Sequence, residues 1–204
     1  MFSVQGHEAE TFFYRKHKIH YTDMENLHQL LLERHSIRRY TDSPIDPDDV
    51  RTILEAALLA PSSKNARSWQ FVVVEDKDTI ARLADCKPAY AASLKKCPLA
   101  VVVTSSPEKS EAYIEDAAVA AIFMHLQAAD LGIGSCWVQV RGRMAADGES
   151  SETVVREILG IPEDMAVECI MTFGYKDEQR RPVDPSKLLW EKVHLERWSD
   201  SQAQ

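Results

Sequence analysis

The chain has 204 residues, 45% of them hydrophobic, and its formal net charge is −8. This composition supports a buried core and excludes a wholly disordered chain. The negative charge argues against nucleic acid and anionic membranes as partners, because both attract proteins with spread positive charge. Any anion must therefore be bound locally.

The cysteines and the apolar residues together indicate a cytoplasmic protein. Cys86, Cys97, Cys136 and Cys169 form no C-x-x-C pair and lie mostly in apolar surroundings. This pattern predicts buried thiols in a reducing compartment. No apolar run approaches the roughly 20 residues of a membrane helix, and the N-terminal stretch lacks the apolar core of a secretion signal. We therefore expect neither membrane association nor export.

Residues 1–21 are predicted to form an N-terminal extension, whose weak periodicity leaves its structure open. His17 and His20 lie three residues apart in it. With no nearby cysteine and no second histidine pair at ligand spacing, they predict solvated side chains and no metal site. Residues 22–204 are predicted to form a single domain, since no repeat, linker or clear boundary interrupts them.

The first part of this domain is predicted to contain two helices and a strand. Thr22 and Glu25 fit a capping box, in which the hydroxyl and the carboxylate satisfy free amide groups at a helix start. The second helix begins after Asp46, a capping residue, and ends before Pro61. The apolar run WQFVVV at residues 69–74 then predicts a buried strand.

Short helices, strands and one long helix are predicted to alternate through the rest of the chain. The long helix, ended by a glycine, has several apolar residues near helical spacing, which predicts one shared face: Ile114, Ala118, Ala121, Ile122, His125 and Ala129. Its alanines would permit close approach of another helix. In chain order we expect helices in 78–95, a strand at 98–105, the long helix at 110–131, a strand at 135–140, a helix at 151–159 that Gly160 ends, and a strand at 165–175.

The stretch RHSIRRY at residues 34–40 crowds three arginines at the end of the first predicted helix. In one interpretation, Arg34 and Arg39 complement the negative helix end and pair with the acidic run at 46–49. In the other, guanidinium forks and the Ser36 hydroxyl form an anion site, because arginine presents planar donors matched to phosphate. This motif alone leaves both interpretations open.

A second motif, APSSKNARSWQF, follows about 25 residues later. It could be a helix stop and a polar turn that leads Trp69 into the core. It also offers hydroxyl, amide and backbone donors on a loop, from Pro61, Ser62, Ser63 and Asn65. The two motifs in this order are more specific than either one alone.

Several common enzyme motifs are absent from the sequence. The close glycine pair Gly132 and Gly134 follows a predicted helix, whereas a dinucleotide fingerprint follows a strand and opens a helix. Neither a G-x-S-x-G elbow nor an H-E-x-x-H helix is present. A Rossmann enzyme and the common hydrolases are therefore disfavoured.

Both motifs, together with LGIGSCWV and a late FGY, resemble the nitroreductase family of FMN-dependent oxidoreductases. The resemblance extends from about Met24 to Trp198. It implies an α+β fold with a central, mainly antiparallel sheet flanked by helices, built as an intertwined homodimer with two FMN sites at the interface.

The resemblance also implies which residues hold FMN. One subunit would contribute Arg34, His35, Ser36 and Arg38, and the other Pro61, Ser62, Ser63 and Asn65. The backbone of Trp137, Val138 and Gln139 would face flavin N5. A basic residue of the C-terminal tail would reach the phosphate; Arg181 is the candidate, with Arg180 and Lys187 as alternatives.

The implied function is a two-step exchange. NAD(P)H first reduces FMN, and the reduced FMN then reduces a nitroaromatic, quinone or similar planar acceptor. A positive charge near the N1/O2 edge of the flavin would favour its reduction, which suits Arg38. No side chain need act as acid or base. A flavin-reserve protein without catalysis, or a dedicated family member with another acceptor, are the alternatives.

Two departures from the family pattern affect the expected substrate. Arg67 and Ser68 stand where many members have glutamine and proline, which adds a cation and removes a rigid residue. Val138 and Gln139 stand where isoleucine and glycine are frequent. A long Gln139 side chain is therefore expected near the flavin face.

Overall fold

The computed structural model describes residues 25–89 and 91–198. Residues 34–180 form one compact unit, and the described residues on either side, 25–33 and 181–198, belong to a second. His17, His20 and Thr22 lie outside the described residues. The predicted single domain over residues 22–204 stays a prediction.

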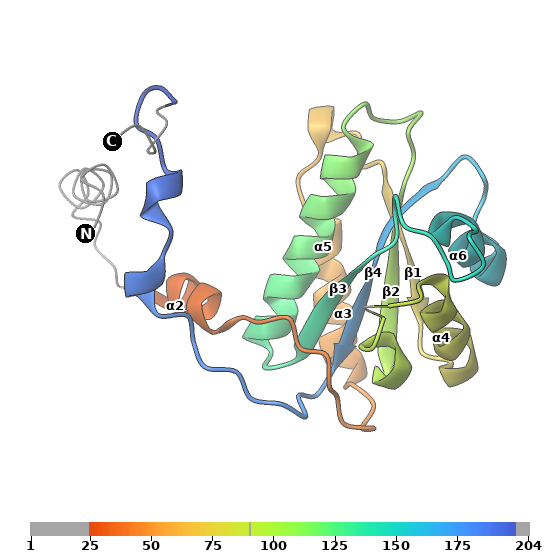
Figure 1. Cartoon of the computed structure of the whole chain (residues 1–204), viewed down its shortest axis with the longest axis horizontal. Coiled ribbons are helices and arrows are strands. Elements are labelled where there is room, and N and C mark those ends of the chain that lie inside the picture. The colour runs from red at the N-terminus through yellow and green to blue at the C-terminus, as the bar shows by residue number, and fades with distance from the viewer. Residues whose placement is uncertain (1–24, 90, 199–204) are drawn as a thin grey trace. The chain divides into compact units, whose positions relative to one another are not determined.

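A four-stranded antiparallel sheet forms the centre of the larger unit (Figure 1). Its strands lie in the order β1-β2-β4-β3, so β1 and β3 are the two edges. Their bounds are β1 Trp69–Val74, β2 Leu99–Ser105, β3 Gly134–Gln139 and β4 Ala166–Gly174. Every residue of β2 is buried, which explains its continuous apolar run. The predicted antiparallel sheet is confirmed.

Helices cover both faces of this sheet (Figure 1). On one face, α3 (Pro47–Leu58) and α5 (Tyr113–Asp130) pack against alternate residues of β2 and β4. On the other face, α4 (Lys77–Leu83) and α6 (Ser151–Leu159) pack against the residues between them. This α+β layering agrees with the fold class that the sequence predicts.

The helix ends follow the predicted capping chemistry. The Asp46 carboxylate accepts a hydrogen bond of 2.9 Å from the Asp48 amide at the start of α3. Gly160 ends α6 with φ +65°, a left-handed conformation that favours glycine. In the smaller unit, α2 spans Glu25–Glu33, and the Val183 amide donates to the Leu32 carbonyl at 2.8 Å.

The face predicted for α5 was partly wrong. Ile122 is 45% exposed, whereas Met124, which lies outside the predicted face, is buried. Ala121 and His125 of that face are buried, as predicted. The buried residues of α5 occupy more than one side of the helix: Asp116, Ala117, Ala120, Ala121, Met124, His125 and Ala128. When a helix is apolar on most sides, the spacing of its apolar residues does not identify which side is buried.

Among its described residues, the region predicted to hold short helices contains one α-helix and two short 3₁₀ helices. After α4 come the 3₁₀ helices η2 (Ala84–Cys86) and η3 (Leu94–Lys96). All four cysteines are free and buried, as predicted. Burial raises the pKa of the Cys86 thiol to about 11 and that of Cys97 to about 12. None of the helices in 25–89 and 91–198 is long and apolar enough to cross a membrane.

Candidate functional site

The RHSIRRY segment lies along the edge of the sheet beside β3. Ser36 forms a parallel bridge with Ser135, and the Ile37 amide donates to the Ser135 carbonyl at 2.9 Å. Further along, the Thr41 amide donates to the Tyr175 carbonyl at 2.9 Å. The backbone of this segment is therefore fixed against the ends of two strands.

Two paired glycines let this segment approach closely. Gly134 lies opposite Gly174 where β3 and β4 pair. A Cβ at Gly134 would lie 2.8 Å from Cγ2 of Ile37, and one at Gly174 would lie 2.8 Å from Cβ of Tyr40. Either contact is too short without movement, so both positions require the absence of a side chain.

Arg34 contacts a buried histidine of α5. Its Nη1 lies 2.7 Å from Nε2 of His125, and Nδ1 of His125 is hydrogen-bonded to Oγ of Ser135. His125 is only 5% exposed. Burial, and secondarily the Arg34 charge, lower the pKa of His125 to about 4. The imidazole is therefore neutral near pH 7.

The backbone around Arg38 is held by a carboxylate from beyond β4. Oε1 of Glu178 accepts hydrogen bonds from the Arg38 amide at 2.7 Å and the Arg39 amide at 3.3 Å. Its other oxygen pairs with Arg180 at 2.9 Å. The hydrogen bond from the Arg38 amide, and after it the charge of Arg180, lower the pKa of Glu178. The exposed guanidinium of Arg38 donates a long hydrogen bond of 3.4 Å to the Ser36 carbonyl.

The structure decides between the two interpretations of these arginines in part. Within the described residues, no ion pair joins Arg34, Arg38 or Arg39 to the acidic run at 46–49. Pairing with that run is therefore not what places three arginines together. Their positive charge is available to an anion.

The edge strand β3 directs alternate backbone groups away from β4. In an antiparallel pair, residues that do not exchange hydrogen bonds with their partner point both N–H and C=O outward. Ser135 is such a residue, because its carbonyl accepts from Ile37. The alternation has a period of two, so Trp137 and Gln139 point their backbone groups to the same side. Since β3 is the last strand, these groups face the open edge.

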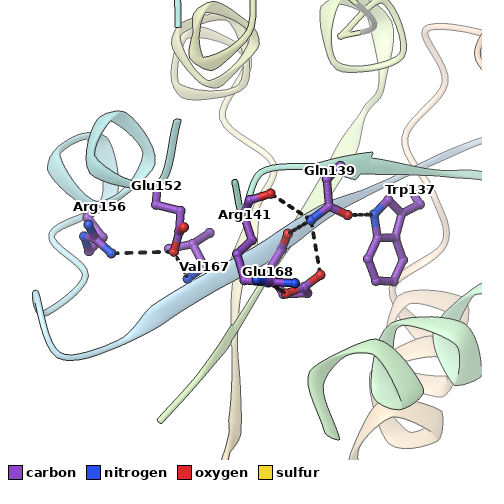
Figure 2. Close-up of polar contacts among 7 residues, drawn as sticks. All are labelled: Trp137, Gln139, Arg141, Glu152, Arg156, Val167 and Glu168. Carbon is purple, nitrogen blue, oxygen red and sulfur yellow. Dashed lines mark hydrogen bonds and ion pairs between the residues drawn. The ribbon is translucent and has the colours of Figure 1, made fainter. Parts of the chain in front are cut away.

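The Gln139 side chain is held by its neighbours (Figure 2). Its oxygen accepts from the Trp137 indole at 2.8 Å, and its nitrogen donates to the side-chain and backbone oxygens of Glu168, each at 3.2 Å. The same nitrogen lies 3.1 Å from the Arg141 carbonyl, and Glu168 binds the Arg141 guanidinium at 2.7 Å. These contacts orient the Trp137 ring and occupy both ends of the Gln139 side-chain amide with hydrogen bonds inside the protein. The sequence predicts this side chain near a flavin face, and that stays a prediction.

The second motif forms a loop with an unusual backbone. Lys64, Asn65 and Arg67 have φ values of 51°, 56° and 48°, a backbone region that residues other than glycine rarely adopt. The Ser62 hydroxyl accepts from the Arg67 amide at 2.9 Å. Asn65 Oδ1 accepts from the Arg67 guanidinium at 3.1 Å. Local side-chain contacts therefore hold a conformation that costs free energy.

A buried carboxylate of α5 fixes this loop to the unit. Asp116 is 4% exposed and accepts from the Ser63 amide at 2.7 Å and from the Ser68 hydroxyl at 3.0 Å. Ser68 in turn accepts from Ser105 on β2 at 2.9 Å. Ser68, one of the two departures named above, is thus part of this network. Trp69 enters the core, as the simpler interpretation of the motif predicts.

The larger unit does not bring the two predicted halves of the site together. Arg34, His35, Ser36 and Arg38 lie beside β3, whereas the loop from Pro61 to Asn65 leads into β1 at the opposite edge. Three strand spacings of about 4.8 Å put roughly 14 Å between those edges. Trp137, Val138 and Gln139 belong to the β3 edge.

The basic residues predicted for the tail differ in their surroundings. Arg180 is paired with Glu178 in the larger unit. Lys187, in the smaller unit, lies 3.9 Å from Asp184. Arg181 also belongs to the smaller unit, where it is exposed. Its predicted contact with a phosphate stays a prediction.

Comparison with known proteins settles the family. The sequence profile described as the Nitroreductase family matches residues 31–87 and 83–175. The chain belongs to the nitroreductase family. A protein of Archaeoglobus fulgidus, named for NADH dehydrogenase/NAD(P)H nitroreductase activity, is 33% identical over 180 residues, which make up 86% of this chain and 100% of that protein.

Solved structures agree with this assignment. An FMN-dependent nitroreductase from Clostridium difficile R20291 has 43% sequence identity and a TM-score of 0.82, covering 83% of this chain and 99% of that one. By sequence alone, an NADPH-flavin oxidoreductase of Vibrio harveyi is also similar, with 26% identity over 162 residues, or 76% of this chain and 68% of that protein. The nitroreductase fold is therefore shown for this chain.

Sequence reasoning missed the side chains that support this nitroreductase site. His125, Asp116, Glu168 and Glu178 each bind a site segment, but none was predicted to do so. A polar residue within an apolar helix is the one available signal for the first two, because buried polar groups need partners. The partners themselves are far away in sequence and depend on the fold.

His125 should make the unfolding free energy of this nitroreductase fall as the pH decreases from about 6.5 to about 4. The folded protein keeps the imidazole neutral down to about pH 4, whereas an unfolded histidine takes up a proton near pH 6.5. The unfolded state binds more protons in this window. The destabilisation should approach roughly 3 kcal/mol at the lower end.

Denaturant unfolding of the wild type and of His125→Gln, at several pH values in this window, measures the effect. Glutamine can retain an acceptor for Arg34 and does not titrate, so the variant should lose less stability than the wild type as the pH falls. Contributions from other groups cancel in the difference. Equal pH slopes for both proteins would contradict a buried neutral imidazole.

Proposed function

We propose that this nitroreductase is an FMN-dependent oxidoreductase that takes hydride from NAD(P)H and passes electrons to nitroaromatics, quinones or similar planar acceptors. The names of its relatives support the reaction class, and the C. difficile structure supports the cofactor. We further propose that it works in the cytoplasm as a homodimer. The four buried free thiols are compatible with a reducing compartment.

The observation that carries the proposal is the open edge of β3. Outward backbone groups at Trp137 and Gln139 continue a line that begins with Arg34 and Ser36 beside Ser135. From Ser135 to Gln139 the strand advances about 14 Å, at about 3.4 Å per residue. A positive end for a phosphate and a row of backbone groups for a planar ring thus lie along one edge.

The residues present fit FMN in chemical type. The Arg34 guanidinium and the Ser36 hydroxyl can donate to phosphate oxygens. Arg38 can place positive charge beside the N1/O2 edge of the ring, and an amide of β3 can donate at N5. When bound, FMN supplies the two-electron chemistry between NAD(P)H and the acceptor. The protein binds and orients both partners, and solvent supplies protons.

Homodimerisation would complete the site. The loop at residues 61–65 lies at the edge opposite β3, so the sheet separates it from the β3 groups that we propose bind the flavin. We propose that the partner subunit supplies Pro61, Ser62, Ser63 and Asn65. The amide nitrogen of Asn65 suits this role, because its oxygen is already used by Arg67. Arg181 is the proposed tail residue at the phosphate.

The absorbance spectrum of the purified protein, with chromatography of the molecule that heat releases, tests the proposed cofactor. FMN in the supernatant, and rapid bleaching of the yellow protein by NADH or NADPH without oxygen, are the expected results. A flavin-reserve protein would be yellow and would not bleach. A colourless protein that takes up no added FMN would refute the proposed function.

Arg38→Ala should lower the reduction potential of bound flavin and the retention of FMN. Loss of a cation near the ring edge disfavours the negative charge that reduction brings, and we expect a shift of roughly 30 mV, which is tenfold in a two-electron equilibrium. Spectroelectrochemistry measures the potential. Arg39→Ala is the matched control, because its amide binds the same Glu178 carboxylate; equal shifts for both variants would refute a specific role of Arg38.

Mixed dimers test whether two subunits share each site. Arg34→Ala and Asn65→Ala should each weaken FMN binding in homodimers. A heterodimer of the two variants should regain one intact site, since one subunit then supplies a wild-type loop and the other a wild-type Arg34. Flavin content per dimer should rise to about half the wild-type value. No recovery in separated heterodimers would contradict an interface site.

A further inference from the structure

His125 is a buried polar side chain that no predicted part of the site includes. It lies within α5, between the Arg34 guanidinium and the Ser135 hydroxyl. At 5% exposure it is almost fully removed from solvent. A buried polar group of this kind lowers stability unless both nitrogens are satisfied, and here both are.

The protonation of this imidazole follows from its partners. Guanidinium is only a donor, so Nε2 of His125 must accept from Arg34. A neutral imidazole then carries its proton on Nδ1, which donates to Oγ of Ser135. The low pKa of His125 is consistent with this neutral form. Ser135 is itself fixed, because its backbone carbonyl accepts from Ile37.

A buried, uncharged ring as partner distinguishes Arg34 from the arginines of the larger unit that are paired with carboxylates. Arg141 and Arg180 are paired with the carboxylates of Glu168 and Glu178, which neutralise their charge. The Arg34 side chain is instead fixed by an uncharged ring. Its position is restricted, yet its full positive charge and its remaining N–H donors stay available to an anion.

We propose that His125 is a positioning residue, which holds the Arg34 guanidinium in place for the phosphate of the flavin nucleotide by way of a neutral hydrogen bond anchored on Ser135. This inference rests on the proposed function, since it needs a phosphate at Arg34. Its physical basis is preorganisation. A flexible arginine loses rotamer freedom when it binds an anion, and a side chain that is already oriented loses less.

The test measures dissociation constants of the apoprotein for two probes, FMN and riboflavin. Riboflavin has the same ring and ribityl chain and no phosphate. His125→Leu removes the acceptor at similar volume and should weaken FMN binding about tenfold, while riboflavin binding stays at the wild-type value. His125→Gln, which can still accept from Arg34, should restore most of the FMN affinity.

A double-mutant cycle separates positioning from general support of the fold. In an Arg34→Ala background, His125→Leu should cause no further loss of FMN affinity, because there is no guanidinium left to orient. Additive losses in the double variant would overturn the inference. An equal loss for FMN and riboflavin in His125→Leu would overturn it too, since that pattern marks a distorted site.

Ser135→Ala provides a second variant that leaves His125 in place. It removes the acceptor for Nδ1 and should weaken FMN binding about threefold, with riboflavin binding unaffected. An unchanged FMN affinity, or an equal loss for riboflavin, would count against Ser135 as the anchor of His125. Wild type that binds neither flavin would overturn the proposed function and this inference together. If the wild type prefers FMN over riboflavin and His125→Leu shows the same preference, this inference alone would be overturned.

Discussion

The antiparallel pairing of β3 with β4 is the constraint on which the site depends. It sets which backbone groups of β3 face the open edge, because those at Ser135, Trp137 and Gln139 share one direction. It also sets which side chains reach α5, since alternate residues point to opposite faces. A one-residue change of register would reverse both, turning the outward amides inward and the Ser135 hydroxyl away from His125.

The long helix α5 connects the two edges of the sheet through buried polar side chains. Asp116 and His125 are nine residues apart, which is two and a half turns at 3.6 residues per turn, so they leave the helix on opposite sides. One fixes the loop before β1 and the other the segment beside β3. Because both are satisfied, an otherwise apolar helix can hold two polar segments without the penalty of unpaired buried groups.

Sequence patterns predict the elements of this protein better than they predict its site contacts. The strands follow from short apolar runs. The start of α3 follows from Asp46, whose carboxylate accepts from a nearby amide, and the end of α6 follows from Gly160, which adopts a left-handed conformation. The burial of α5 does not follow, because its alanines make most sides equally apolar. Ile122 was therefore expected inside and is exposed.

The site motifs were predictable as segments, but their supporting partners were not. Arg34 meets a residue 91 positions away, and Ser63 one that is 53 positions away. The Gln139 side chain was expected near a flavin, which stays a prediction, but its binding to Glu168, which adjoins its register partner Cys169 on β4, was not foreseen. Such pairings depend on register and topology, which local propensity does not encode.

The arginines around the candidate site differ in whether a carboxylate neutralises their charge. Arg141 and Arg180 are neutralised by carboxylates that also hold nearby polar groups. Glu178 binds the backbone amides of Arg38 and Arg39, which fixes their main chain without pairing their guanidinium groups. With Arg34 fixed by a neutral imidazole, the segment keeps its charge while its geometry is restricted. A chain of net charge −8 can in this way present a local anion site, because carboxylates restrain the peptide and leave the side chains to the ligand.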